Sequence, residues 1–323
     1  MIPALAGLAV RVSAGSGDAP VVEGQATVIV VVGAPGEEEY GKLFAEWAEA
    51  WKAPCARAGA RLVTIGLDAN KDNDLGRLQA ALQGEPKAGA GDLWLVLLGH
   101  GTFDGKAAKF NLRGPDLEDR QLAAWLAPFE RPLAVVNASS ASAPFLAALS
   151  KPGRVVVSAT KSGNEQNFAR FGGYFSKAIG GLEADLDKDG QVSLLEAWLH
   201  AASQAAEFYK IEGRLATEHA LLDDNGDGQG TPADWFRGVR AVKRAAEGAS
   251  VDGRRAHQFH LVRSEVEQRL PAALRAKRDE LELAVFKLRD DQALFPKEEY
   301  DRKLEELLLR LARLYEEGAA SKP

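Results

Sequence analysis

The sequence predicts an α/β protein in which helices cover both faces of a mostly parallel sheet, followed by a C-terminal α-helical hairpin. The first observation is a series of short apolar segments of strand length, at 26–32, 61–65, 93–98, 133–137 and 154–160. The second is that helical patterns fill the intervals between them, an alternation typical of parallel sheets. The third is a change after about residue 249, where glycine becomes rare, charge becomes dense and leucines recur at helical spacing.

The segment at 26–32 is β-branched and continuous, as expected of a buried strand, and a Gly-Ala-Pro-Gly sequence ends it. Glu37 to Glu39 then place negative charge on the first turn of a helix, where the helix dipole favours it. Large apolar residues at helical spacing form the buried face of this helix: Tyr40, Leu43, Phe44, Trp47 and Trp51. Pro54 should end or kink the helix near Cys55, which we interpret as a small helix-end residue and not as a nucleophile.

Each remaining strand leads into a helix. Asn73 or Asp74 caps a helix after the strand at 61–65, and Asp116 to Asp119 can cap another after the strand at 93–98. The strand at 133–137 ends in small, hydroxyl-bearing residues, and an aromatic-rich helix follows the strand at 154–160. The apolar positions that these helices should bury are Leu78, Leu82, Leu122, Trp125, Leu126, Phe168, Phe171, Phe175, Ala178 and Ile179.

The six apolar residues at 93–98 stop at Gly99-His100-Gly101. Open α/β sheets bind ligands at the carboxyl ends of their strands, which makes His100 a candidate site residue. The two glycines let the backbone turn sharply and leave room beside the imidazole. The alternative is a histidine that only caps a loop.

Composition narrows the classes of function. The chain has 323 residues, of which 46% are hydrophobic, so it can form a sizeable core. A net charge of −6 gives no reason to expect a nucleic-acid partner. Cys55 is the only cysteine, and no apolar stretch is long enough to span a bilayer. Ile2 to Val10, followed by Val12-Ser13-Ala14, resembles a weak or truncated export signal; the alternative is a lead-in, residues 1–24, that contributes nothing to the fold.

Residues 185–196 fit the twelve-residue calcium-binding loop throughout. The expected ligands, at positions one, three, five, seven and twelve, are Asp185, Asp187, Asp189, Gln191 and Glu196. Gly190 supplies the sharp turn, Gln191 acts through its backbone carbonyl, and Glu196 is the bidentate twelfth ligand. Hard oxygen ligands at this spacing suit Ca²⁺, because Mg²⁺ demands a tighter octahedron. The alternative is a solvated Asp/Gly turn that binds no ion.

Residues 223–234 form a second, less complete version of the same loop. Its expected ligands are Asp223, Asn225, Asp227, Gln229 and Asp234. Gly230 replaces the usual apolar eighth residue and Asp234 is a short twelfth ligand, so this loop should bind Ca²⁺ more weakly or partly through water. The alternative is an Asx-rich turn. A weak calcium loop works best where Ca²⁺ is abundant, which favours an exported or periplasmic location over the cytoplasm.

Gly99-His100-Gly101 after a buried strand, with a second strand that ends in a small-residue turn, resembles the caspase/legumain-like superfamily of cysteine peptidases, clan CD. The resemblance covers about residues 25 to 235. It implies a caspase-like three-layer α/β/α sandwich and makes His100 the counterpart of the catalytic histidine. The family's cysteine belongs in a turn after the strand at 133–137. Ser140 takes its place here, or Ser139 if the alignment shifts by one.

The missing cysteine changes the expected chemistry. A thiol beside a histidine ionises at moderate cost, whereas a serine hydroxyl needs a base held by a third group and an oxyanion hole. The sequence shows no clear third partner for His100. We therefore expect a calcium-binding pseudo-peptidase that acts as a binding or scaffold module for a protein or peptide partner. The alternative is a hydrolase, a peptidase that uses a Ser140/His100 pair.

These observations divide the chain into the lead-in at 1–24, a caspase-like domain at 25–248 and a helical hairpin or coiled coil at 249–323. The hairpin is expected from apolar residues at three-and-four spacing on two helices: Leu274, Leu281, Val285 and Leu288, then Tyr300, Leu304, Leu307, Leu311 and Leu314. Its apolar face can dock on the main domain or pair with another chain, which would produce self-association.

Overall fold

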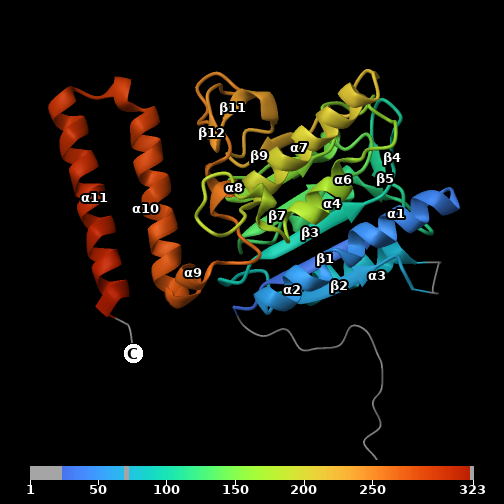
Figure 1. Ribbon diagram of the computed structural model, residues 1–323, viewed down its shortest axis with the longest axis horizontal. Coiled ribbons are helices and arrows are strands. Elements are labelled where there is room, and N and C mark those ends of the chain that lie inside the picture. Colours follow the sequence, from blue (N-terminus) through green and yellow to red (C-terminus); the bar gives the residue numbers. More distant parts are fainter. Residues whose placement is uncertain (1–23, 69–72, 321–323) are drawn as a thin grey trace, which may run out of the picture.

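Seven strands form the central sheet of the computed structural model, which describes residues 24–68 and 73–320 (Figure 1). The expected export-signal segment lies outside these residues. The strand order is β10-β9-β8-β7-β3-β1-β2. The strands are β1 (Thr27–Val32), β2 (Arg61–Ile65), β3 (Leu93–Leu98), β7 (Leu133–Asn137), β8 (Arg154–Ser158), β9 (Leu221–Asp223) and β10 (Thr231–Pro232). The first five pair in parallel, and β9 and β10 extend the sheet in antiparallel fashion.

Helices cover both faces of this sheet, because successive side chains of a strand point to opposite sides. Val28 and Val30 face a core that includes Trp47, Phe175 and Trp198. This side carries the helices α1 (Glu38–Glu49), α2 (Lys52–Ala58), α6 (Phe171–Ala178) and α7 (Leu194–Ile211). The opposite side carries α3 (Asp74–Gly84), α4 (Asp119–Leu126) and α5 (Ala143–Leu149) around a second core. The predicted three-layer α/β/α sandwich with a mostly parallel sheet is confirmed.

Several short elements were not predicted. A three-stranded sheet, with β4 (Gly101–Phe103), β5 (Ala108–Phe110) and β6 (Leu117–Glu118), follows directly after His100. A small hairpin joins β11 (Phe236–Arg237) and β12 (Arg240–Ala241). Single turns of 3-10 helix occur at η1 (Leu182–Ala184), η2 (Ala233–Trp235) and η3 (Gln292–Leu294). Strands of two or three residues are too short for an alternating pattern to emerge.

Pro54 does not end the first helix, as the sequence suggested. Helix α1 ends at Glu49, and Pro54 lies in the first turn of α2, where its missing N–H is not needed. Cys55 is buried within α2, and burial raises the pKa of its thiol to about 12. The expectation that Cys55 is not a nucleophile agrees with this environment.

The boundary expected after residue 248 needs correction. The segment that contains α8 (Arg254–Gln258) belongs to the α/β core, because Ala256, Phe259 and Leu261 are buried in the same cluster as the sheet. The helical hairpin begins beyond this segment. It comprises α9 (Glu265–Arg269), α10 (Ala272–Asp290) and α11 (Lys297–Ala320), and α10 and α11 run side by side to one side of the sandwich (Figure 1).

The predicted C-terminal hairpin is thus confirmed, with apolar residues of both helices buried between them: Leu281, Val285, Leu288, Tyr300 and Leu314. Within the described part of the chain, no helix combines the length and the apolar character that crossing a membrane requires.

Candidate functional site

His100 lies at the point where the sheet changes its direction of winding. The chain passes from β1 outward to β2, and from β3 in the other direction to β7. Crevices form at the carboxyl ends of such strands. Nε2 of His100, after β3, lies 3.3 Å from the carbonyl oxygen of Pro35, after β1. Because that carbonyl can only accept, a hydrogen bond between them requires the tautomer with the proton on Nε2.

Aromatic rings surround the imidazole of His100. Its ring centroid lies 4.9 Å from that of Tyr40, 5.2 Å from that of Phe44 and 6.0 Å from that of Phe168. Burial lowers the pKa of His100, and the hydrogen bond with Pro35 offsets part of the effect. The histidine therefore lies in an apolar setting that disfavours its charged form.

Ser140 lies at the same edge of the sheet but turns its hydroxyl to the backbone. Its Oγ accepts a hydrogen bond from the N–H of Gly101 and donates one to the carbonyl of Gly101, both at 3.0 Å. Ser139 Oγ donates to Asn137 Oδ1 at 2.7 Å. Both serines are buried, and neither forms a hydrogen bond with His100 in the described structure. The sequence-predicted pair is thus brought close together without the contact that a nucleophile and its base require.

This packing also explains Gly101. A Cβ atom at this position would lie 2.9 Å from Ser139 Oγ and would collide with the carbonyl oxygen of Ser140. Ala141 follows in the left-handed region, with φ of 53°, which is a strained conformation for a residue other than glycine. The structure therefore has the expected sharp turn after β7, and the small residues of this turn pack closely against the loop after β3.

Hydrogen bonds from its own backbone to its aspartates organise the first acidic loop. Asp185 at position one accepts from the N–H groups of positions four and six, Lys188 and Gly190. Asp187 and Asp189, at positions three and five, each accept from the N–H two residues further on. Ligand atoms of these three aspartates lie within 4.8 Å of one another.

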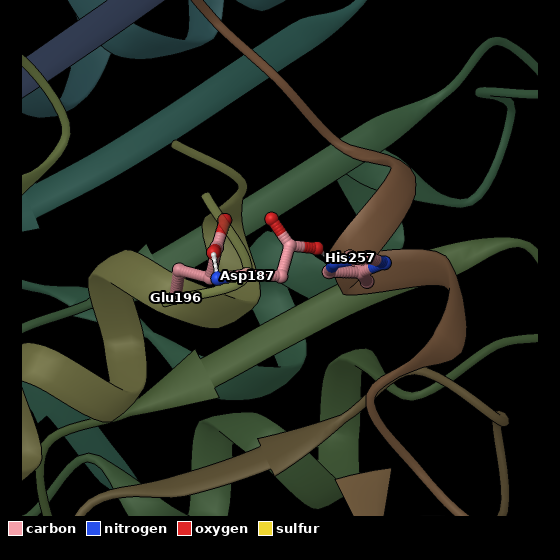
Figure 2. A group of neighbouring side chains, drawn as sticks. All are labelled: Asp187, Glu196 and His257. Carbon is pink, nitrogen blue, oxygen red and sulfur yellow. Dashed lines mark hydrogen bonds and ion pairs between the residues drawn. The ribbon is translucent and has the colours of Figure 1, made fainter. Parts of the chain in front are cut away.

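Glu196 closes this loop from the first turn of α7. Its Oε1 accepts from the N–H groups of positions two and three at 2.8 and 3.3 Å, and its Oε2 accepts from the Ser193 hydroxyl, position nine, at 2.8 Å. Ser193 and Glu196 also form a capping box. Figure 2 shows Asp187 between Glu196 and His257, whose Nε2 lies 2.9 Å from Asp187 Oδ2.

The second acidic loop repeats the pattern bond for bond. Asp223 at position one accepts from positions four and six, at 2.9 and 3.0 Å. Asn225 and Asp227, at positions three and five, accept from positions five and seven, both at 2.8 Å. Position four has positive φ in both loops, at Lys188 and Gly226. The second loop matches the sequence pattern less well, yet its internal hydrogen bonds are as regular as those of the first loop.

Asp252 closes the second loop, in the way that Glu196 closes the first. Its Oδ1 accepts from the N–H groups of positions two and three at 3.0 and 3.2 Å, and its Oδ2 accepts from the hydroxyl of Thr231, position nine, at 2.5 Å. Asp234, the twelfth residue by spacing, lies exposed in η2, and its carboxylate forms no hydrogen bond or ion pair within the described residues. The sequence assignment of Asp234 is corrected accordingly. No sequence signal pointed to Asp252, which is 18 residues further along the chain than Asp234.

Three carboxylates are buried at the second loop without a basic partner. Asp223, Asp224 and Asp252 are 1%, 6% and 2% exposed, and none pairs with a lysine or arginine among the residues that the structure describes. Burial raises the pKa of all three carboxyl groups, and the charge of Asp224 raises the pKa of Asp252 further. Buried like charges are costly unless a cation offsets them.

Helix α8 connects the two loops. The carboxylate of Asp224 accepts hydrogen bonds from the N–H groups of Gly253 and Ala256, at 2.9 and 2.8 Å, and so holds the start of the helix. His257, near the end of the helix, contacts Asp187 of the first loop. The acidic loops and the segment at 251–258 therefore form one connected cluster.

Comparisons with known proteins give no family assignment. No family model and no curated protein matches the sequence. The structure is similar to the initiator caspase Dronc of Drosophila, with a TM-score of 0.41 and 12% identity over 61% of this chain and 79% of that one. A protein of Geobacter sulfurreducens is similar with a TM-score of 0.39 and 14% identity, over 55% of this chain and 89% of that one. Caspase-1 of Spodoptera frugiperda is similar with a TM-score of 0.39 and 10% identity, over 66% of this chain and 94% of that one. At these values the similarities assign neither a family nor an activity to this chain.

Proposed function

We propose that this chain is a calcium-binding, caspase-like protein without peptidase activity, which serves as a binding or scaffold module. The observation that carries the proposal is the shared hydrogen-bond pattern of the two acidic loops. In each loop one carboxylate accepts hydrogen bonds from positions two, three and nine. Glu196 fills this role in the first loop and Asp252 in the second.

The donor sets fit Ca²⁺ better than a transition metal. Ca²⁺ takes six to eight oxygen ligands in a flexible arrangement. We assign Asp185, Asp187, Asp189, the Gln191 carbonyl and Glu196 to one ion. A second ion would use Asp223, Asn225, Asp227, the Gln229 carbonyl and Asp252. Bound Ca²⁺ would supply the positive charge that the buried carboxylates of the second loop lack.

The second ion would fasten the segment at 251–258 to the sandwich. That segment also contacts the helical hairpin. Arg254 Nη2 lies 2.6 Å from Asp290 Oδ2, and Gln258 Nε2 donates a hydrogen bond to the backbone carbonyl of Asp279 at 2.9 Å. Calcium binding in the second loop would thereby fix the position of α10 and α11. We propose that the hairpin is the part presented to a protein partner or to a second copy of the chain. Light scattering of the chain with and without residues 264–323 tests whether the hairpin binds a second copy.

The contacts of the two serines support the absence of peptidase activity. Each hydroxyl is buried and hydrogen-bonded away from His100, and Nε2 of the histidine faces the carbonyl of Pro35. A serine nucleophile requires a base that accepts its proton. The competing hydrolase proposal predicts labelling by a fluorophosphonate probe that is lost in Ser140→Ala, and absence of labelling would remove it.

Hydrogen–deuterium exchange of the full chain in excess EGTA and in Ca²⁺ tests the calcium proposal. We expect Ca²⁺ to slow exchange at Gly253 and Ala256, whose amides bond to Asp224, as well as in both loops. Mg²⁺ serves as the matched control and should protect far less. Equal exchange in EGTA and Ca²⁺ at both loops would contradict the proposal.

A further inference from the structure

A cavity of about 420 Å³ opens beside the aromatic surroundings of His100, away from both acidic loops. Three parts of the chain line it: the first turns of α1, the segment before α6, and the end of α7 with the loop that follows. The lining residues that matter are Tyr40, Leu43, Phe168, Arg170, Tyr209 and Arg214. Because Tyr40 and Phe168 also contact the His100 ring, the cavity adjoins the crevice where the sheet changes its direction of winding.

Two arginines line the cavity, and their positive charge is offset only in part, by the charge of Glu218 near Arg170 and by Glu39. Within the described structure, neither Arg170 nor Arg214 forms an ion pair or a side-chain hydrogen bond. The guanidinium of Arg170 is held in place over the ring of Phe208, 4.1 Å from its centroid. The nearby carboxylate of Glu218 does not pair with it, because its oxygens accept from the backbone N–H groups of Arg170 and Phe171 and from the Tyr209 hydroxyl.

Part of the cavity lining is apolar, and the guanidinium of Arg170 lies over it, 5.3 Å from the centroid of the Phe168 ring. The rings of Tyr40 and Phe168 lie with centroids 4.7 Å apart, and Leu43 continues this surface along α1. Glu39 is exposed at the rim. A guanidinium that is already oriented loses little freedom when it binds a planar or tetrahedral oxyanion. The cavity thus combines oxyanion donors with an adjoining surface for an apolar group.

We propose that this cavity binds a small ligand that carries a phosphate or carboxylate group on an apolar body of about the size of one ring. The oxyanion lies against Arg170 and Arg214, and the apolar body lies against Tyr40, Leu43 and Phe168. His100 does not touch the oxyanion in this arrangement. It contacts the other side of Tyr40 and Phe168, so its ring environment changes when the ligand binds.

Calorimetric titration of the full chain with two probes tests this assignment. Phenyl phosphate and phenylacetate each carry an oxyanion one atom away from a phenyl ring, through an oxygen in the first and a methylene in the second, so the probe that binds more tightly indicates the class of oxyanion. Benzyl alcohol lacks the charge, and inorganic phosphate lacks the ring. We expect saturable binding of at least one charged aromatic probe, with both controls weaker by roughly tenfold or more.

Variants localise the binding. Arg214 is exposed, so Arg214→Ala should fold normally and weaken the tighter probe by roughly tenfold, and Arg170→Gln should weaken it at least as much. Arg240→Ala, an exposed arginine on β12, is the matched control and should leave affinity unchanged. The imidazole proton signals of His100 should shift on binding.

Three results would overturn the assignment. The first is no saturation by either charged probe up to roughly 10 mM, the weak limit for ligands of this size. The second is binding that both arginine variants leave unchanged. The third is inorganic phosphate binding as tightly as phenyl phosphate, which would mean that the apolar wall contributes nothing.

Discussion

Replacing Asp252 by asparagine should reduce the calcium response while leaving the calcium-free protein at least as stable as the wild type. The asparagine keeps one acceptor oxygen for the N–H groups of Asp224 and Asn225, and its amide can donate to the Thr231 hydroxyl. The variant replaces a buried carboxyl that has no basic partner among the described residues and whose pKa burial and the charge of Asp224 raise to about 8. In the calcium-free protein this carboxyl already favours its neutral form near pH 7, so the neutral amide should not destabilise the fold.

The magnitude follows from mass action. A site at one hundred times its Kd adds about 2.7 kcal/mol to the free energy of unfolding. Loss of one ligand charge and one ligand oxygen should weaken the site at least about tenfold, which lowers that contribution to roughly 1.4 kcal/mol. With about 2–4 °C of Tm per kcal/mol for domains of 150–250 residues, the calcium-induced rise in Tm should shrink by roughly 3–5 °C.

Thermal denaturation followed by tryptophan fluorescence, in EGTA and in Ca²⁺, measures this change. Asp234→Asn is the matched control, because Asp234 is the twelfth residue by spacing but lies exposed outside the loop. It should retain the full calcium response. The assignment of Asp252 would be refuted by a full response in Asp252→Asn together with a reduced one in Asp234→Asn.

Further predictions concern the sheet edge and the buried titratable groups. Gly101→Ala should destabilise the fold by about 1–3 kcal/mol in urea denaturation, because its Cβ collides with Ser140 and Ser139; a neutral effect would contradict the packing described. Cys55 should resist iodoacetamide at pH 8 until the protein unfolds, since burial raises its pKa to about 12; rapid labelling of the native protein would show that the thiol is accessible. Burial lowers the pKa of His260 to about 4, so the unfolded chain binds its proton more readily. Stability should therefore fall as pH drops from about 6.5 to 4, by at most about 3 kcal/mol, and His260→Gln should flatten this part of the profile.

The strands and the sandwich could be predicted because their signal is local. Each of the five parallel strands is a run of apolar residues bounded by polar or glycine-rich turns, and the intervening helices place their apolar residues at helical spacing. The first acidic loop is equally local, since all of its expected ligands lie within twelve residues. Sequence spacing also placed His100 and Ser140 at one edge of the sheet, because β3 and β7 are neighbours.

The remaining features depend on contacts between distant residues. Asp252 reaches the second loop only because the chain folds back through α8, and spacing pointed instead to Asp234. The same fold-back buries Phe259 and Leu261, in a segment whose charge density suggested a separate unit. The hydroxyl of Ser140 points to the Gly101 backbone, an orientation that no residue pattern encodes.

Crystals grown in Ca²⁺ and measured for anomalous scattering would test the central claim most directly. We predict two peaks, one bounded by the carboxylates of Asp185, Asp187, Asp189 and Glu196, and one bounded by Asp223, Asp227 and Asp252. No peak at either loop, or a second ion held by Asp234 while Asp252 stays apart from it, would contradict the account.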